Sequence, residues 1–212
     1  MSDRVELHRR LAYAKWQAYA KPHETDRITY GDEWVYAPDA VMMCPLFYGG
    51  EPQRMADLYN DEVAAAMAEY APDGDMLTPE FRMYWKYMPD YRIVTPFECT
   101  ATEWGFTQCD TYAGTLADGT VLKLREWDYV WTHERGQITR WDWFVDSREF
   151  YPLLELIGLD PENLTLQEYT VNFLRQGGIR SQAPTGSLLP ASRREPPRIR
   201  PISGVHASAG GR

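Results

Sequence analysis

The sequence predicts an α+β fold, with a curved, mostly antiparallel sheet, N-terminal helices on its concave face, and C-terminal helices and a tail after it. Two observations lead to this expectation. Apolar residues recur at helical spacing in much of residues 4–87, whereas residues 91–146 are rich in Val, Ile, Thr, Tyr, Phe and Trp and follow the period of strands. A length of 212 residues suits one domain with a core and is short for two.

The first half is expected to contain helices at 4–20, 52–69 and 79–87 and a short strand at 40–44. Pro22 ends the first helix, because proline lacks the N–H that another turn would use. Pro79 suits the first turn of the third helix. The pattern of residues 24–37 fits either a loop or a short helix.

The second half is expected to contain strands at 91–100, 103–116, 120–132 and 137–146. The dipeptide Asp118-Gly119 is a strong signal for a two-residue hairpin turn, and Arg135-Gly136 is a weaker one. Consecutive strands joined by such turns are antiparallel neighbours, so this half predicts the body of the sheet.

Two helices and a tail follow the strands. Ser147 is placed to cap a helix to about residue 157, and Thr165 with Glu168 has the spacing of a capping box that opens another. We expect one domain at 1–178 and a tail at 179–212, rich in Pro, Ser, Gly and Arg. The tail carries six Arg and one Glu, a charge of +5 that leaves −14 on the remainder. It is either flexible or a basic arm that packs on an acidic neighbouring subunit.

Composition narrows the class of function. A net charge of −9 argues against nucleic acid as a partner. The N-terminus has no signal-peptide pattern and no run of apolar residues is long enough to span a membrane. The cysteines, Cys44, Cys99 and Cys109, are odd in number and lack metal-binding spacing, which favours a reducing, cytoplasmic compartment. The 8 Trp and 14 Tyr suit either a Trp-rich core or a site for aromatic ligands.

Pairing across the predicted turns divides the strand residues between two faces. With Asp118-Gly119 as the turn, Thr111 lies opposite Glu126 and Cys109 opposite Asp128. The expected core face carries Cys109, Thr111, Ala113, Leu122, Leu124, Glu126, Asp128, Val130, Trp141, Trp143 and Val145.

Glu126 and Asp128 are the anomaly of this otherwise apolar face. Burial raises the pKa of a carboxyl group until it becomes neutral or finds a partner. Such a group is suited to acid–base chemistry or to donating a hydrogen bond. The alternative is structural: the two side chains bond Thr111, a tyrosine hydroxyl or a tryptophan indole and do nothing else. We favour a site, because the two carboxylates share one face.

The opposite face is expected to carry Trp127, Tyr129, Trp131 and Phe144 among charged residues, including Arg125 directly across from Asp146. Aromatic residues and Arg are enriched in subunit interfaces. We therefore expect a homodimer or homotrimer, with the tail lying against another subunit. The alternative is that the C-terminal helices fold back and cover this face.

The stretch from Tyr36 to Pro45 (YAPDAVMMCP) and the strand from Gly136 to Asp146 (GQITRWDWFVD) resemble the nuclear-transport-factor-2-like superfamily. Its members include SnoaL-type polyketide cyclases, ketosteroid isomerase, limonene epoxide hydrolase and scytalone dehydratase. The resemblance covers roughly residues 5–158 and implies a cystatin-like cone fold with an apolar pocket.

At the level of residues, the resemblance to ketosteroid isomerase is partial. Cys44 stands where the isomerase has its catalytic carboxylate, so that base is missing; Cys44 is expected to be a small buried residue. Asp128 falls at the position of the isomerase's protonated carboxyl group. Tyr13 and Tyr19 are the candidates for the helix tyrosine beside it. The His–Asp pair of the dehydratases is not apparent.

The resemblance and the residues together suggest a lyase that needs no cofactor or metal and that acts on a hydrophobic, aromatic small molecule by dehydration or retro-aldol cleavage. Formaldehyde-releasing lyases of lignin-derived diaryl compounds are the nearest analogy. The expected catalytic residues are Asp128, Glu126, Tyr13 and Tyr19, and the expected substrate-binding residues are Trp16, Tyr30, Met43, Cys44, Thr111, Trp141 and Trp143. An isomerase, an epoxide hydrolase and a non-catalytic binding or assembly module are the alternatives.

Overall fold

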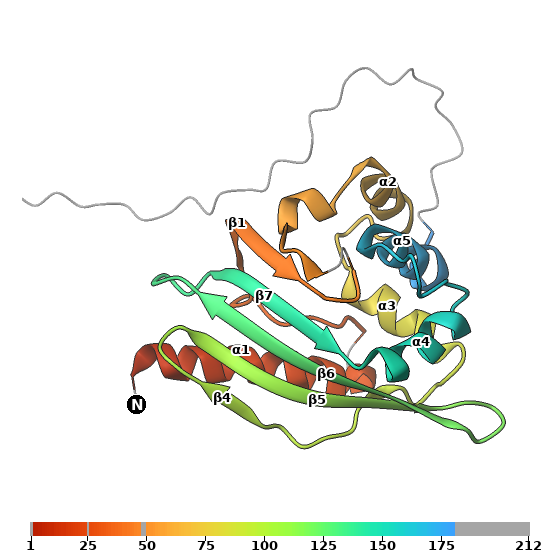
Figure 1. Cartoon of the computed structure of the whole chain (residues 1–212), viewed down its shortest axis with the longest axis horizontal. Helices are drawn as coiled ribbons and strands as arrows, with labels where there is room; N and C mark the ends of the chain where they lie inside the picture. Colours follow the sequence, from red (N-terminus) through yellow and green to blue (C-terminus); the bar gives the residue numbers. More distant parts are fainter. Residues whose placement is uncertain (1, 25, 48–49, 181–212) are drawn as a thin grey trace, which may run out of the picture. The chain divides into compact units, whose positions relative to one another are not determined.

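The computed structural model describes residues 2–24, 26–47 and 50–180 (Figure 1). Its elements are α1 (Asp3–Ala20), the 3-10 helix η1 (Pro22–Glu24), β1 (Tyr36–Met43), β2 (Gln53–Arg54), the 3-10 helix η3 (Met55–Leu58), α2 (Asp61–Tyr70), α3 (Leu77–Trp85), β3 (Arg92–Ile93), β4 (Cys99–Ala101), β5 (Gly105–Thr115), β6 (Val121–Thr132), β7 (Ile138–Val145), α4 (Ser147–Leu156) and α5 (Leu166–Gly177). The tail from residue 181 onward lies outside the described residues, so the arm stays a prediction. No helix in the described ranges is long and apolar enough to cross a lipid bilayer.

The sheet has the strand order β2-β1-β7-β6-β5-β3, with β4 also paired to β5. All its pairings are antiparallel except that of β1 with β7, which is parallel. The predicted α+β fold is confirmed, as is the prediction that β5, β6 and β7 are consecutive antiparallel neighbours. Helix α1 packs against β3, β4 and β5, while α5 packs on α2 and α3 (Figure 1).

Local signals explain most helix boundaries. The Ser2 hydroxyl accepts a hydrogen bond from the Val5 N–H and so begins α1. The helix predicted at 52–69 is wrong in its first part: residues 53–58 form β2 and a 3-10 turn, and α2 begins only after Asn60, whose side chain accepts from the Val63 N–H. The capping box of Thr165 and Glu168 at the start of α5 is confirmed.

Prolines explain two differences among the strands. The strand predicted at 91–100 is two short strands, because the chain leaves the sheet around Pro96, which cannot donate to a ladder. The strand predicted at 40–44 begins earlier, at Tyr36, and its register with β7 shifts between Tyr36 and Val41, a stretch that contains Pro38.

The hairpin between β5 and β6 differs from the prediction by one residue. Leu116 and Thr120 form the last bonded pair, and the Gly119 N–H donates to the Leu116 carbonyl, so the turn has three residues instead of two. Gly119 takes a φ of 86°, the left-handed conformation that closes such a turn. As a result Asp110 lies opposite Glu126, and the predicted pairing of Thr111 with Glu126 is wrong.

The hairpin between β6 and β7 keeps its predicted pairing for a different reason. Its turn also closes over three residues, since the His133 N–H donates to Gln137 and the Gly136 N–H donates to His133. The register then shifts, since Thr132 pairs with Ile138 and Trp131 with Arg140, and the extra β7 residue Thr139 offsets the longer turn. The predicted register of Asp128 opposite Trp143 is therefore confirmed.

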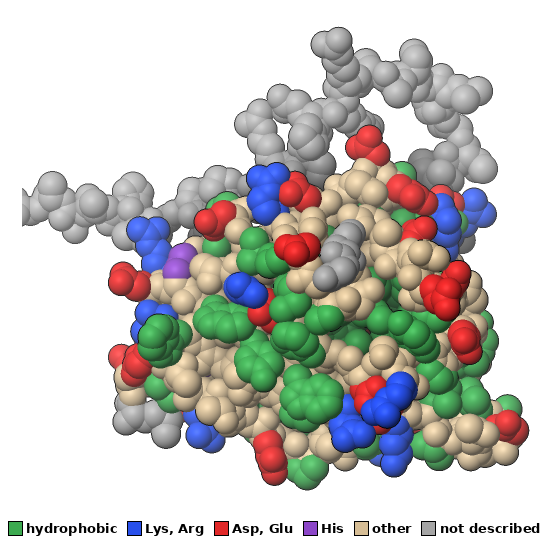
Figure 2. Space-filling view, in the orientation of Figure 1, with side chains coloured by type: hydrophobic (Ala, Val, Ile, Leu, Met, Phe, Trp, Pro, Cys, Tyr) green, Lys and Arg blue, Asp and Glu red, His purple; other side chains and the backbone are tan. Residues whose placement is uncertain are grey.

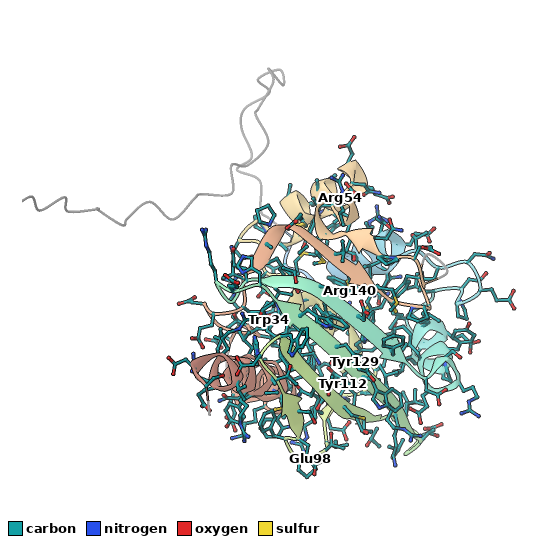
Figure 3. All side chains as sticks on the ribbon, turned by 60° about the vertical axis from the view of Figure 1, so that its left-hand side comes forward. Trp34, Arg54, Glu98, Tyr112, Tyr129 and Arg140 are labelled. Carbon is teal, nitrogen blue, oxygen red and sulfur yellow. The ribbon has the colours of Figure 1, made fainter. Side chains whose placement is uncertain are left out.

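The opposite face of the sheet carries the expected aromatic residues. Trp127 and Tyr129 are 37% and 40% exposed, and Figure 2 shows hydrophobic side chains gathered over the sheet. The Arg140 guanidinium pairs with Asp142 at 2.7 Å and lies 5.3 Å from the ring centre of Trp131; Figure 3 labels Arg140 and Tyr129 on neighbouring strands. Helices α4 and α5 do not cover Trp127 or Tyr129.

Arg125 and Asp146 lie across from each other as predicted, since the Asp146 N–H donates to the Arg125 carbonyl, but their side chains bind other partners. The Asp146 carboxylate accepts from the Arg148 N–H at the start of α4, so Asp146, and not Ser147, caps this helix. Arg125 instead pairs with Glu149 at 3.0 Å.

Candidate functional site

Lys15 of α1 directs its ammonium at the sheet, where three carboxylates surround it. Nζ lies 2.7 Å from Glu126 Oε1, 2.7 Å from Asp128 Oδ2 and 3.5 Å from Asp110 Oδ2. The side chains of Lys15, Asp110 and Asp128 have no exposed surface, and that of Glu126 is 7% exposed. We call these four residues the Lys15 cluster.

The register of the sheet assembles this cluster. The pairing of β5 with β6 sets Asp110 directly opposite Glu126, and Gln108 opposite Asp128. Glu126 and Asp128 are two residues apart on β6 and so share a face. The Gln108 amide donates to Asp110 Oδ2 at 2.8 Å, which fixes that carboxyl group beside Lys15.

Two indoles of β7 hold the carboxylates of β6 from the other side. Trp141 Nε1 donates to Asp128 Oδ1 at 2.5 Å, and Trp143 Nε1 donates to Glu126 Oε2 at 2.7 Å. The Tyr112 hydroxyl adds a longer bond of 3.3 Å to Glu126 Oε1. Glu126 therefore accepts from an ammonium, an indole and a phenol, three donors that hold its carboxyl group in place.

The charges of the cluster do not balance, since one ammonium faces three carboxyl groups. Burial alone would lower the pKa of Lys15, but the surrounding carboxylates together raise its pKa well above the ordinary value, so Lys15 stays charged. Burial, and next the charge of Glu126, raise the pKa of Asp128 well above its ordinary range. Burial likewise raises the pKa of Asp110. The two aspartates are thus the groups that retain a proton most readily.

Beside the cluster lies a cavity of about 370 Å³ between the sheet and the helices. Nearly half of its lining residues are aromatic, and they come from the loop before β1, from the helices and from the strands. The aromatic lining residues are Tyr19, Tyr30, Trp34, Tyr36, Tyr59, Phe81, Tyr84, Tyr91, Tyr112, Trp141, Trp143, Phe150, Tyr169 and Phe173. Glu126 is the member of the Lys15 cluster that lines it. The volume falls in the usual range for small-molecule sites.

A second carboxyl group, that of Glu80 on α3, also lines the cavity. The Tyr169 hydroxyl donates to Glu80 Oε1 at 2.6 Å, and the Tyr84 hydroxyl lies 3.0 Å from that of Tyr169. Burial raises the pKa of Glu80 to about 7, against the opposing effect of the Tyr169 hydrogen bond. A carboxyl group with this pKa exchanges a proton near neutral pH, as general acid–base catalysis requires.

The structure brings together part of the predicted site. Glu126, Tyr19, Tyr30, Trp141 and Trp143 all line the cavity. The hydroxyl groups of Tyr19 and Tyr30 are hydrogen-bonded to each other. Asp128 lies on the predicted face but does not line the cavity, because Lys15 and Trp141 bind its two oxygens.

Other predicted site residues lie elsewhere. Tyr13 is 44% exposed and packs on Trp16 and Phe97. The Trp16 Nε1 donates to the Thr95 carbonyl. Both residues therefore belong to the side of α1 that faces residues 94–99. They are misplaced because helical spacing alone does not tell which side of α1 meets the sheet.

The remaining predicted binding residues are also absent from the cavity lining. Thr111 lies on the other face of β5, opposite Arg125, as a result of the one-residue difference at the Gly119 turn. Met42 lines the cavity, so Met43, next to it on β1, points the other way. Cys44 is buried in the core, and burial raises its thiol pKa to about 12, as befits an inert thiol.

The carboxylates of the cluster have the composition of a metal site, since ligand oxygens of Asp110, Glu126 and Asp128 lie within 4.8 Å of one another. The Lys15 ammonium, however, already supplies a cation at 2.7–3.5 Å from these oxygens. The group therefore fits an ammonium rather than an added metal ion.

Sequence reasoning missed Lys15, Asp110 and Glu80. A signal existed for Lys15, because Leu11, Lys15 and Tyr19 follow one another at four-residue spacing, which places a charge within the apolar stripe of α1. Glu80 similarly sits one turn before Tyr84, on the side of α3 that is otherwise apolar. Asp110 was hidden by the assumed two-residue turn.

Fold and site together define a small α+β protein with an aromatic cavity and a buried ion cluster beside it. The sequence matches no family model and no curated protein. Solved structures similar to this chain include an NTF2-like protein from Burkholderia thailandensis, with 13% identity over 73% of this chain and 98% of that chain and a TM-score of 0.41. A protein of the SnoaL-like family from Agrobacterium tumefaciens has 16% identity over 66% and 98% of the two chains and a TM-score of 0.32.

A third similar structure is a protein with a ketosteroid-isomerase-like fold from Catenulispora acidiphila, with 12% identity over 73% of this chain and 96% of that chain and a TM-score of 0.37. The predicted resemblance is thus found again among solved structures. Identities this low say nothing about chemistry, so the activity of this chain has to come from its own side chains.

Proposed function

We propose that this protein is a lyase that acts on a hydrophobic, aromatic small molecule through acid–base catalysis by its own carboxyl groups. The observation that carries the proposal is that Glu126 and Glu80 line one aromatic cavity in different electrostatic environments. Two carboxyl groups that face the same cavity can act as base and acid in one reaction.

Glu126 is the proposed base. Lys15, Trp143 and Tyr112 all donate to its oxygens, so the carboxyl group enters the reaction in a fixed position. These donors also hold the carboxylate in one rotamer, which reduces the reorganisation needed for proton transfer.

Glu80 is the proposed acid, and it takes the place of Asp128 as the second carboxyl group beside Glu126. With a pKa of about 7, a large fraction of Glu80 is protonated at neutral pH. After it gives up its proton, the hydroxyl of Tyr169, 2.6 Å away, stabilises the carboxylate that remains.

A substrate with two hydroxyl groups on a three-carbon chain next to an aryl ring would use both residues. Glu126 takes the proton of the terminal hydroxyl, the adjacent C–C bond breaks, and formaldehyde leaves. The electron pair of that bond forms a C=C bond as the benzylic C–O bond breaks, and the departing hydroxyl leaves as water with the proton of Glu80. The products are an aryl alkene, formaldehyde and water, and a proton passes between the carboxyl groups through solvent before the next turnover.

The aromatic wall suits this reaction. Positive charge develops on the benzylic carbon as the C–O bond breaks, and the faces of tyrosine and tryptophan rings attract positive charge. The same rings limit the access of water, which would otherwise add to this carbon.

The test uses a 1,2-diaryl-1,3-propanediol with one free phenol, and it measures formaldehyde and the absorbance of the conjugated alkene. An aryl epoxide and a β,γ-unsaturated ketone are tested in parallel for hydrolase and isomerase activity. We expect Glu126→Gln and Glu80→Gln each to lower the rate about 100-fold or more. The matched control is Glu134→Gln, which changes an exposed glutamate.

Turnover of only the epoxide or the ketone would replace the lyase by one of the other activities. Binding of all three compounds without turnover would make the protein a binding module. Full diol cleavage by Glu80→Gln would remove Glu80 from the mechanism.

A further inference from the structure

Trp34, in the loop that precedes β1, carries an indole N–H that forms no hydrogen bond of good geometry with the described residues. Its indole nitrogen is buried and has no hydrogen-bond partner among the described residues. The ring lies against Tyr30 and Trp141, with ring centres 4.6 Å and 5.6 Å away, and it lines the cavity (Figure 3). A buried donor without an acceptor costs free energy in the folded protein, which a bound acceptor would recover.

Two tyrosine hydroxyls belong to the same end of the cavity. Tyr36, at the start of β1, and Tyr59, just after η3, both line it. The Trp34 indole lies close enough to the Tyr36 hydroxyl to lower its pKa as a hydrogen-bond donor, although this contact does not reach hydrogen-bond geometry, and Tyr59 acts in the opposite direction. Burial chiefly raises that pKa above the ordinary tyrosine value, so Tyr36 remains a neutral hydroxyl that can donate.

The charges around the cavity decide which acceptor fits. The acidic side chains of Asp75, Glu80 and Glu126 line it, against the single guanidinium of Arg27. Arg27 Nε lies 3.5 Å from Asp75, so part of its charge is already compensated. Lys15 in turn offsets the charge of Glu126, and Glu80 is partly protonated near pH 7, so the described lining offers an anionic ligand no uncompensated cation, whereas a neutral oxygen atom needs none.

We propose that Trp34, Tyr36 and Tyr59 form a subsite for the oxygen atom of a neutral aryl ether or phenol. The ring that carries this oxygen packs beside Tyr30 and Trp141, and the oxygen accepts hydrogen bonds from the Trp34 indole and the Tyr36 hydroxyl. That the ligand is a substrate rests on the proposed function. The inference adds that this substrate has a ring that carries an oxygen atom. Its test needs only binding.

The test compares 4-methoxybiphenyl with 4-ethylbiphenyl, two probes of similar shape of which only the first has an oxygen acceptor, by isothermal titration calorimetry. We expect the wild-type protein to bind the methoxy compound about fivefold more tightly, as one added hydrogen bond implies. Trp34→Phe and Tyr36→Phe should each reduce this preference without weakening binding of the ethyl compound to the same extent. Trp104→Phe is the control, since Trp104 is 70% exposed.

Equal affinities of the wild-type protein for the two probes would overturn the subsite. A preference that both variants keep would overturn the assignment to Trp34 and Tyr36. If Trp34→Phe fails to fold, Tyr36→Phe still tests the assignment, because it removes one hydroxyl only. A preference for the methoxy probe without cleavage of the diol would support this subsite and contradict the proposed lyase activity. The failure of one proposal is therefore distinguishable from the failure of the other.

Discussion

Lys15 Nζ and Glu126 Oε1 lie 2.7 Å apart, although 111 residues separate them in the chain. This buried ion pair joins α1 to the central strand β6 and leaves one carboxylate of the cluster facing the cavity. The architecture of the site and the stability of the fold therefore depend on the same four side chains.

We predict that Lys15→Met destabilises the protein by about 3–5 kcal/mol at pH 8, because it leaves buried carboxylates without their cation. The pKa values of Asp110 and Asp128 are already raised, and removal of Lys15 raises them further. Protonation then relieves the repulsion, so the loss should be smaller at pH 5. Urea unfolding at both pH values measures this. Lys21→Met, which changes an exposed lysine just after α1, is the control; equal losses for the two variants would contradict the prediction.

We predict that Glu80→Gln stabilises the protein at alkaline pH. The folded pKa of about 7 lies above the ordinary value, so the stability that protonated Glu80 contributes is complete below about pH 4 and is lost as the pH rises through 7. The glutamine variant should gain on the order of 2 kcal/mol relative to wild type at pH 8.5 and little at pH 5. Thermal unfolding measures the difference, and a gain independent of pH would argue against a raised pKa.

The pH dependence of catalysis gives a separate prediction. If Glu80 is the acid, kcat/KM for diol cleavage falls as the pH rises through about 7. Tyr169→Phe removes the hydrogen bond that opposes the raised pKa, so the fall should move to higher pH. An unmoved profile in Tyr169→Phe would mean that another group titrates.

Gly119→Ala should cost about 1–2 kcal/mol, the cost of the left-handed conformation for a residue with a β-carbon. No atom lies within 4 Å of the position that the new β-carbon would take, so the loss is conformational and not steric. Gly119→Asn is the control, because asparagine tolerates this conformation, and it should recover much of the loss in urea unfolding. Equal losses for alanine and asparagine would point to a different cause.

We also propose that the protein is a homodimer or homotrimer that associates through the aromatic face around Trp127 and Tyr129. Light scattering should give a multiple of the 24.6 kDa chain mass at micromolar concentration. Trp127→Ser with Tyr129→Ser should weaken the association, whereas Trp104→Ser should not. A wild-type mass near that of one chain excludes association, and removal of residues 181–212 tests the tail separately.

The sequence predicted the fold better than the site, and the difference has a physical cause. Period and capping residues are local signals, so β6, β7 and α5 were placed correctly. The site depends on the angle at which α1 meets the sheet and on the length of the Gly119 turn, which together bring Lys15 and Asp110 to Glu126. A one-residue error in a turn reverses the faces of a strand, and so Thr111 was taken for a site residue instead of Asp110.

The separation between Lys15 and its partners also matters while the protein is being made. At synthesis rates of about 5–20 residues per second, roughly 6–22 s pass between the addition of Lys15 and that of Glu126. Throughout this interval α1 has left the ribosome's catalytic centre without the strands that neutralise its lysine. Helix α1 can therefore complete the Lys15 cluster only after β6 has been synthesised.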